Sequence, residues 1–182
     1  MKIISGSQTG ADIAGLKVAK KYGFETGGFI PKGFVTLDGP KPLYANLYNI
    51  QETKTNDYPT RTGLNVKHSD CTIWLDATTL PPKDGEDRFS RGKLCTFKFI
   101  KLHKKPFKDI NINNLPNVEK LAKWIVYNNF NIINIAGNSE NKYNNMEEKV
   151  SKYLNKLFKE LQKYDSDISD SNTSNSDTND SE

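Results

Sequence analysis

The chain has 182 residues, 35% of them hydrophobic and 26% charged, with a formal net charge of +4 at pH 7. This length suits one domain with a sizeable core and leaves little room for a second. No apolar run approaches the length that crosses a membrane, and no charged and apolar leader precedes the first predicted strand, so we expect a cytoplasmic protein with no membrane partner.

The first segment, MKIISGSQTGADIAGLKVAKKYGF, predicts a strand, a tight turn and a helix. Ile3 and Ile4 are followed by the turn SGSQTGAD and then by apolar residues near helical spacing. The start of this helix is expected to present unpaired N–H groups and a positive dipole end, which suit an anion. A simple helix cap by Ser7 or Thr9 explains the same residues equally well. The turn matches neither the P-loop pattern GxxxxGK[ST] nor the dinucleotide pattern GxGxxG.

Strand and helix patterns alternate through the rest of the body. We expect a short strand in FETGGFIPKGF, an irregular stretch in LDGPKPLY, a short helix after Pro59 and a buried strand in CTIWLDA. A polar loop, TTLPPKDGEDRFS, leads to a second small-residue turn, SRGKLCT, and a helix. Next come a strand in KPFKDINI, a helix in NVEKLAKWIVYNN, a strand in FNIINIAG and a long helix in MEEKVSKYLNKLFKELQKY. The alternation predicts a three-layer α/β fold, with a mostly parallel sheet flanked by helices on both faces.

The loops at one edge of this sheet are the expected place for a ligand. In open α/β sheets, ligands bind beyond the carboxyl ends of the strands, near the switch in strand order. The loops after Ile4, Ile30, Leu75 and Gly137 should therefore face one crevice. The last helix carries an apolar stripe, which indicates core or a partner contact: Val150, Tyr153, Leu154, Leu157, Phe158 and Leu161.

The last 18 residues differ from the body in composition. Residues 165–182 contain six acidic residues, no Lys or Arg and one apolar residue, so we expect a disordered acidic tail rich in Ser, Asn and Asp. Residues 1–164 then form the domain and carry 26 basic and 16 acidic residues, a net charge of +10. Such a body attracts polyanions, but no aromatic-plus-basic recognition motif accompanies the scattered lysines, so we do not expect a nucleic-acid partner.

The two cysteines and two histidines show no metal-ligand spacing. Cys71 and Cys95 are far apart and lie in apolar settings, and His68 and His103 are isolated. We expect reduced thiols in the core and no protein-ligated metal.

Five segments, in order, resemble motifs of one family. SGSQTGADIAGL resembles SGGQTGxDxAAL, GGFIPKGFVTLDGPKPLY resembles GGWxPKGRxAEDGxIPxxYPL, and YPTRTGLNVKHSDCTIWL resembles YxxRTxxNVxDSDxTLI. SRGKLCTFKFIKLHKKP resembles SGGTxLTxxxAxxxxKP, and NIAGNSE resembles NVAGPRES. The chain thus resembles the family called "putative molybdenum carrier", which is related to the lysine-decarboxylase-like (SLOG) nucleotide-binding superfamily.

The resemblance implies a Rossmann-like fold, a homo-oligomer and an anionic small-molecule ligand that carries phosphate. The inferred ligand is the molybdenum cofactor (molybdopterin), a phosphorylated pterin that holds its metal through a dithiolene, and a nucleotide is the other candidate. Related phosphoribohydrolases have a PGGxGTxxE turn whose glutamate assists departure of a base, but SRGKLCTFK has Lys98 near that place. We therefore expect a binding protein with no catalytic residues. The alternatives are a hydrolase of N-glycosidic or phosphate bonds and a scaffold that has lost its ligand.

The expected ligand-binding residues lie in the matched motifs. Arg61 is expected to clamp an anion, with Asp12 holding it, although a purely structural ion pair of Arg61 with Asp12 or Asp70 is the other interpretation. The first turn contributes Ser5, Gly6, Ser7, Gln8, Thr9 and Gly10, and the second turn contributes Arg91, Gly92, Lys93 and Thr96. The other expected residues are Lys32, Gly33, Asp38, Asn65, Ser69 and Asp70.

Four residues in the matched segments, at three places in the chain, depart from the family pattern in ways that bear on the site. Ser7 stands where the motif has its second glycine, Arg91-Gly92-Lys93 stands for Gly-Gly-Thr, and His68 stands for an aspartate. The two cations of the second turn should strengthen attraction to phosphate, while only arginine can bind it in bidentate fashion.

Overall fold

Six parallel strands form the central sheet, in the order β5-β2-β1-β8-β6-β7. The computed structural model describes residues 1–77 and 91–173. The strands of the sheet are β1 (Lys2–Ile4), β2 (Glu25–Ile30), β5 (Ile50–Glu52), β6 (Cys71–Asp76), β7 (Phe107–Asn111) and β8 (Ile132–Gly137). A separate antiparallel hairpin of β3 (Val35–Thr36) and β4 (Gly39–Pro40) occupies part of the stretch predicted to be irregular.

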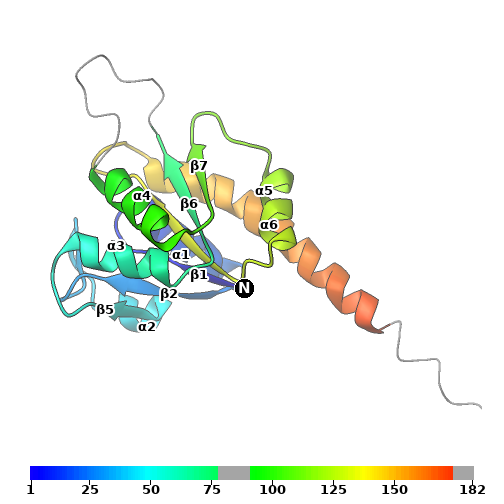
Figure 1. Cartoon of the computed structure of the whole chain (residues 1–182), viewed down its shortest axis with the longest axis horizontal. Coiled ribbons are helices and arrows are strands. Elements are labelled where there is room, and N and C mark those ends of the chain that lie inside the picture. The colour runs from blue at the N-terminus through cyan, green and yellow to red at the C-terminus, as the bar shows by residue number, and fades with distance from the viewer. Residues whose placement is uncertain (78–90, 174–182) are drawn as a thin grey trace, which may run out of the picture.

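Helices cover both faces of the sheet (Figure 1). On one face α1 (Ala11–Lys21) and α5 (Val118–Tyr127) pack against α6 (Met146–Thr173), and on the other α3 (Tyr58–Lys67) packs against α4 (Arg91–His103). The short α2 (Tyr44–Tyr48) lies beside β5. The three-layer α/β, Rossmann-like prediction is confirmed.

Side-chain caps determine where two of the helices begin. The Asp57 carboxylate accepts a hydrogen bond from the Thr60 N–H at 2.7 Å at the start of α3, and Pro59 occupies the first turn, where no N–H is needed. The Asn117 side chain accepts from Glu119 N–H at 2.7 Å at the start of α5. These caps satisfy backbone donors that the helices themselves leave unpaired.

The larger core lies between the sheet and the layer of α1, α5 and α6. β6 is buried along its whole length, as a central parallel strand requires, and the predicted stripe on α6 is buried in this core. Gly15 lets α1 approach β8, because a Cβ there would lie 2.8 Å from Ile135 Cβ. A smaller cluster of Ile13, Leu16, Ile30, Tyr48 and Ile50 joins α1 to α2 and β5.

The chain leaves the carboxyl edge of the sheet in two directions. β1 leads into α1 on one face, whereas β6 is followed by α4 on the other, and β1 and β6 flank β8. Strand order therefore changes direction around β8, which places a crevice at this edge.

Two of the sequence predictions fall wholly or partly outside the described residues. The polar loop TTLPPKDGEDRFS spans 78–90, which are not described. The acidic tail was expected to begin at Asp165, but α6 continues to Thr173, and 174–182 are not described. The disordered tail stays a prediction.

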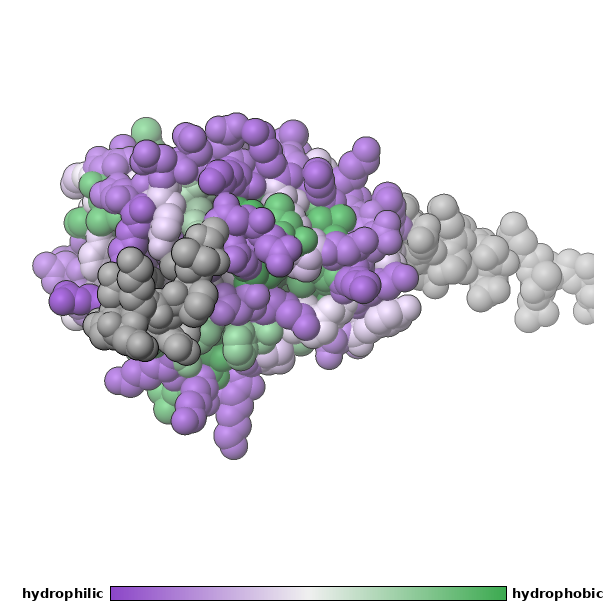
Figure 2. Space-filling view, turned by 90° about the horizontal axis from the view of Figure 1, so that it is seen from above, coloured by the Kyte–Doolittle hydropathy of each residue, from purple (hydrophilic) through white to green (hydrophobic). Residues whose placement is uncertain are grey.

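The described surface gives no sign of a membrane-spanning element. Within 1–77 and 91–173, no helix combines the length and hydrophobicity needed to cross a bilayer. The face in Figure 2 is mostly hydrophilic, with apolar side chains in small separate groups.

The packing of α6 predicts a large difference between two identical substitutions. Leu157 is fully buried on α6, whereas Leu102 at the end of α4 is 64% exposed. Leu157→Ala should lower the free energy of unfolding in urea by about 2–5 kcal/mol, and Leu102→Ala should change it by less than about 0.5 kcal/mol. Similar losses for both variants would contradict the assignment of this stripe to the core.

Candidate functional site

A cleft of about 350 Å³ opens at the carboxyl edge of the sheet. Its lining comes from the first turn and α1, the β3–β4 turn, α3, the start of α4 and the loop after β8: Gln8, Asp12, Leu37, Tyr58, Arg61, Arg91, Gly92, Gly137, Asn138, Ser139 and Lys142. Segments distant in sequence thus meet at the crevice that the topology creates.

Arg61 reaches from α3 onto the backbone of the first turn. A Cβ at Gly6 would lie 1.7 Å from Arg61 Nη1 and 2.4 Å from Cζ, so the guanidinium occupies space that any other residue at position 6 would fill. Arg61 Nη1 donates to Asp12 Oδ2 at 3.4 Å, and its Cζ lies 5.6 Å from the Tyr58 ring centroid. Gly6 is therefore required for the position of Arg61.

Arg61 remains only partly satisfied by this arrangement. Its side chain is 13% exposed, and Nε is a buried donor without a hydrogen-bond partner among the described residues. A buried polar atom left unpaired costs about 1–3 kcal/mol, which makes such an atom a candidate ligand contact. Ser5 Oγ, Ser7 Oγ and Thr9 Oγ1 in the adjacent turn are buried and unpaired in the same way.

Asp12 is a buried carboxyl that faces the cleft. Burial raises its pKa above the ordinary 3.8, because desolvation disfavours the charged form. The charge of Arg61 and backbone hydrogen bonds from Gln8 and Gly137 oppose this rise without cancelling it. The site thus holds a carboxyl that is shifted toward its neutral form beside a permanent cation.

The start of α1 is closed by the chain itself, which corrects one expectation. Ala11 N–H donates to Asn138 O at 3.1 Å, and Ile13 N–H donates to Gln8 O at 3.0 Å. Gly10 has φ 84°, and a Cβ there would lie 2.5 Å from Asn138 O. The expectation of unpaired N–H groups at this helix start is wrong for these two residues, because the loop after β8 lies across it.

Gln8 holds the hairpin rather than presenting its amide to the cleft. Its Nε2 donates to Val35 O at 3.0 Å, and its Oε1 accepts from Leu37 N–H at 3.1 Å. Leu37 is thereby fixed at the rim of the cleft. Gln8 acts as a positioning residue.

Several expected site residues have structural partners elsewhere. Asn65 pairs with both backbone groups of Phe29, at 2.9 and 3.0 Å. Ser69 Oγ donates to Val66 O, and Asp70 accepts from the backbone N–H groups of Asn131 and Ile132 at the amino ends of the strands. These three residues are not brought to the cleft. Of the two ion-pair partners considered for Arg61, Asp12 and Asp70, the structure pairs Arg61 with Asp12.

Only some residues of the second turn face the cleft. Arg91 and Gly92 line the cleft, whereas Lys93 is buried and its Nζ lies 2.7 Å from Asp76 Oδ2 and 2.9 Å from Asp109 Oδ2. Burial lowers the pKa of Lys93, but the hydrogen bonds to Asp109 and Asp76 outweigh it and raise that pKa overall. Lys93 therefore anchors α4 and stays charged, and the expectation that it faces the ligand is not supported.

The remaining expected residues lie outside the cleft lining. Lys32 and Gly33 are exposed, and Gly33 N–H donates to Glu52 at 2.6 Å. Thr96 is buried in α4. Ser7, Thr9 and Asp38 line a different, smaller cavity.

Six cleft residues were absent from the expected set: Leu37, Tyr58, Gly137, Asn138, Ser139 and Lys142. Asn138 and Ser139 lie in the matched segment NIAGNSE, directly after β8, so their position at a carboxyl end was a usable signal. Asn138 Oδ1 accepts from Ala77 N–H at 2.8 Å and joins the ends of β8 and β6. Tyr58 opens the matched segment YPTRTGLNVKHSDCTIWL, so it also carried a usable signal, whereas Lys142 lies outside every matched segment.

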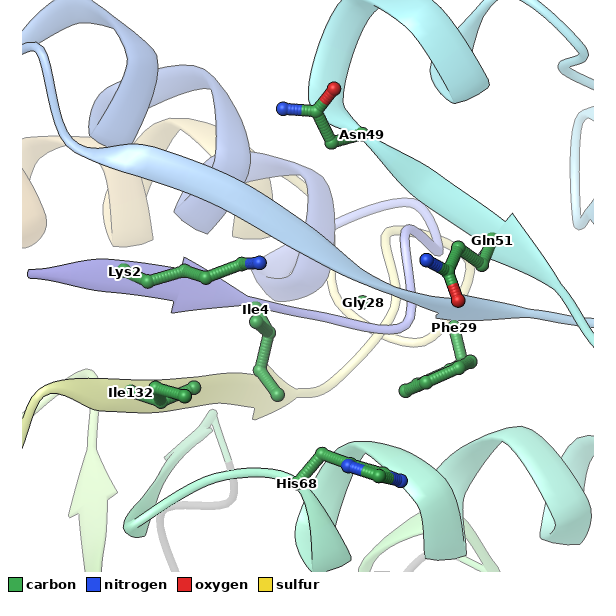
Figure 3. Close-up of a pocket in the computed structure, with 8 residues that line it drawn as sticks. All are labelled: Lys2, Ile4, Gly28, Phe29, Asn49, Gln51, His68 and Ile132. Atoms are coloured by element: carbon green, nitrogen blue, oxygen red, sulfur yellow. The ribbon is translucent and has the colours of Figure 1, made fainter.

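A second hollow, of about 200 Å³, lies on the sheet surface between β5 and the end of α3 (Figure 3). Lys2, Gln51 and His68 reach it from different elements, and the Phe29 ring points toward His68, with ring centroids 5.3 Å apart. It contains none of the buried unpaired atoms found near the cleft. We therefore place the candidate site at the carboxyl edge.

No metal centre is evident in the described part of the chain. Residues 1–77 and 91–173 contain no group of three or more His, Cys, Asp or Glu side chains placed to hold a metal ion. The cleft chemistry is that of cations and hydrogen-bond donors.

Comparison with known proteins identifies related sequences and one related structure. Residues 3–158 match the sequence model of the family described as "Circularly permutated YpsA SLOG family". No curated protein matches significantly. The chain is similar to a crystal structure described as a "Putative molybdenum carrier protein" from Syntrophus aciditrophicus SB, with 33% identity and a TM-score of 0.71, over 86% of this chain and 93% of that one.

The contact between Arg61 and Gly6 predicts a rescue in a double variant. Gly6→Ala should destabilise the protein by about 1–3 kcal/mol, because the new methyl group overlaps Arg61. In an Arg61→Ala background the same change should cost clearly less, as measured by urea unfolding of all four proteins. Equal costs in both backgrounds would mean that Arg61 does not lie on Gly6.

The raised pKa of Asp12 predicts a pH-dependent difference in stability. The folded state holds the Asp12 proton more tightly than the unfolded state, so the contribution of Asp12 to wild-type stability should fall as pH rises from about 4 through the raised pKa. Asp12→Asn removes this ionisation, so the free energy of unfolding of the variant minus that of the wild type should increase over that range. A difference that is independent of pH, or that decreases, would show that Arg61 overrides burial.

Proposed function

The chain belongs to the circularly permutated YpsA SLOG family, and from that membership and the cleft geometry we propose that it binds a phosphate-bearing small molecule at the carboxyl edge of the sheet. The observation that carries this proposal is Arg61, held against Gly6 with its buried Nε unpaired. A guanidinium in that state offers a donor to a phosphate oxygen.

The charge of the cleft favours an anion. Among the described residues, Arg61, Arg91 and Lys142 line it, against one carboxyl group, Asp12, whose pKa is raised. Arginine binds phosphate with parallel hydrogen bonds, and burial favours the neutral form of Asp12, which does not repel an anion as the ionised form does. The cleft cations thus outnumber the opposing charge.

The shape and apolar wall favour a ring compound of modest size. Tyr58 and Leu37 are 38% and 46% exposed and offer faces for stacking. About 350 Å³ is at the lower end of ligand pockets, which suits a mononucleotide or a phosphorylated pterin better than a dinucleotide.

The molybdenum cofactor is one candidate cargo, and a nucleotide is the other. The similar crystal structure is described as a molybdenum carrier, and a pterin that holds its own metal needs no metal ligands from the protein. The cationic cleft fits the phosphate of either molecule. A homo-oligomeric state and a cytoplasmic location stay predictions.

A hydrolase is the second candidate function, because Asp12 supplies a carboxyl group of the kind that the second turn lacks. It is a carboxyl in the cleft, with a raised pKa, next to an arginine that can hold a phosphate. A carboxyl shifted toward neutrality is a suitable proton donor to a departing base. In this proposal Asp12 is the proton donor, and Lys98 has no role.

The binding proposal predicts a specific loss on a conservative change. Arg61→Lys keeps the charge but loses the planar fork, so affinity for adenosine monophosphate or a phosphorylated pterin should fall by about 1–2 kcal/mol, or about tenfold. Isothermal titration of both ligands is the measurement. Lys32→Ala is the matched control, since Lys32 lies outside the cleft lining and its loss should leave affinity unchanged. Unchanged affinity in Arg61→Lys, with the fold intact, contradicts the clamp.

Turnover separates the carrier from the hydrolase. If the protein only binds its ligand, incubation with nucleoside monophosphates should release no free base by chromatography. Release that disappears in Asp12→Asn, while binding persists, would overturn the carrier proposal in favour of the enzyme.

A further inference from the structure

The first turn also faces a second cavity, which we call the inner cavity, of about 120 Å³. Ser7 and Thr9 line it from the turn, and Thr36 and Asp38 line it from the β3–β4 hairpin. The residues between them, Gln8 and Leu37, line the cleft instead, and the two cavities share no lining residue. The turn and hairpin together therefore separate two distinct spaces.

We propose that the inner cavity binds a compact tetrahedral oxyanion, independently of the ligand that the cleft takes. Ser7 is 1% exposed, and its Oγ has no hydrogen-bond partner among the described residues. Thr9 Oγ1 is buried and unpaired as well. Two such hydroxyls lining one small cavity are an arrangement that an acceptor-rich ligand satisfies.

Ser7 departs from the matched family motif and has an unusual backbone conformation for a residue with a side chain. Its backbone has φ 59°, in the left-handed region where glycine is favoured, and the matched family motif has glycine at this position. The chain thus carries a side chain where the backbone conformation disfavours one. The hydroxyl that this substitution adds is one of the two unpaired groups of the inner cavity.

The remaining wall supplies more donors than free acceptors. Lys17 and Lys41 bring two ammonium groups, and Lys17 Nζ is paired with Glu147 Oε1 at 2.5 Å. Lys41 makes no ion pair within 1–77 and 91–173. Burial, and to a lesser extent the nearby Tyr48, raises the pKa of Tyr44, so the Tyr44 hydroxyl stays protonated at neutral pH.

Among the described residues, two carboxylates line the inner cavity and oppose an anion. Glu147 is paired with Lys17, whereas Asp38 is exposed at the hairpin turn and makes no ion pair in the described residues. A protonated oxyanion such as hydrogen phosphate can donate to the Asp38 carboxylate, whereas sulfate and molybdate at neutral pH cannot. We therefore expect phosphate to bind more tightly than the other two.

The volume limits the ligand to a few atoms. A space of about 120 Å³ corresponds to about four water molecules at their share of liquid volume. A nucleotide or pterin does not fit in it, but phosphate, sulfate or molybdate does. The inner cavity is therefore not a second copy of the cleft site.

The test is a calorimetric titration of the full-length chain with inorganic phosphate, sulfate and molybdate, each measured separately. Ser7→Gly removes one hydroxyl and suits φ 59°, so it should fold at least as stably as the wild type. Thr9→Val removes the other with little change of shape. Each should weaken phosphate binding about tenfold, as expected for a hydrogen bond to a charged group.

Matched variants separate the two cavities. Phosphate bound in the cleft should weaken in Arg61→Lys but not in Ser7→Gly, whereas phosphate bound in the inner cavity should show the reverse. Lys41→Met should weaken the inner site, and Lys32→Met, a loss of an exposed lysine outside both cavities, should not. No binding of any oxyanion, or binding that Ser7→Gly and Thr9→Val leave unchanged, overturns the proposal and leaves only water to satisfy these hydroxyls.

Discussion

The Arg61 guanidinium lies against the backbone of Gly6, and the carboxyl edge of the sheet is built around this contact. Arg61 comes from α3 on one face, and its partner Asp12 comes from α1 on the other, so the pair bridges the two helical layers above the end of the sheet. Only a residue without a Cβ permits this approach at position 6. The position of the cleft cation therefore depends on one glycine.

The first turn distributes its polar groups among several partners. Ala11 N–H donates a hydrogen bond to the loop after β8, and the Gln8 side-chain amide forms hydrogen bonds with the β3–β4 hairpin. The Asp12 carboxyl accepts a hydrogen bond from Arg61. Ser7 lines the inner cavity, and its hydroxyl has no hydrogen-bond partner among the described residues. The N–H groups of Ala11 and Ile13 at the start of α1 are thus paired within the chain, so the side-chain cations of the cleft, and not these two N–H groups, are left to meet the proposed anion.

Periodicity predicted the architecture because long elements carry strong patterns. The buried strand β6 and the α6 stripe were both evident, whereas β3 and β4, with two residues each, are too short to show alternation. Local patterns also cannot show that Lys93 meets Asp76 and Asp109, because those contacts depend on the tertiary fold. Ser69 and Asp70 were assigned to the site although they precede a strand, and parallel topology places such residues at the amino edge, away from the cleft.

The most direct measurement of the central claim is the Arg61 Nε–H signal in a nitrogen–proton NMR titration with adenosine monophosphate. The chain has three arginines, Arg61, Arg88 and Arg91, so Arg61→Lys assigns the signal by its loss. Because Nε is buried and unpaired, we expect a slowly exchanging signal that shifts as ligand is added. A titration that moves backbone amides elsewhere and leaves the Arg61 Nε–H signal in place would show that Arg61 does not hold the ligand.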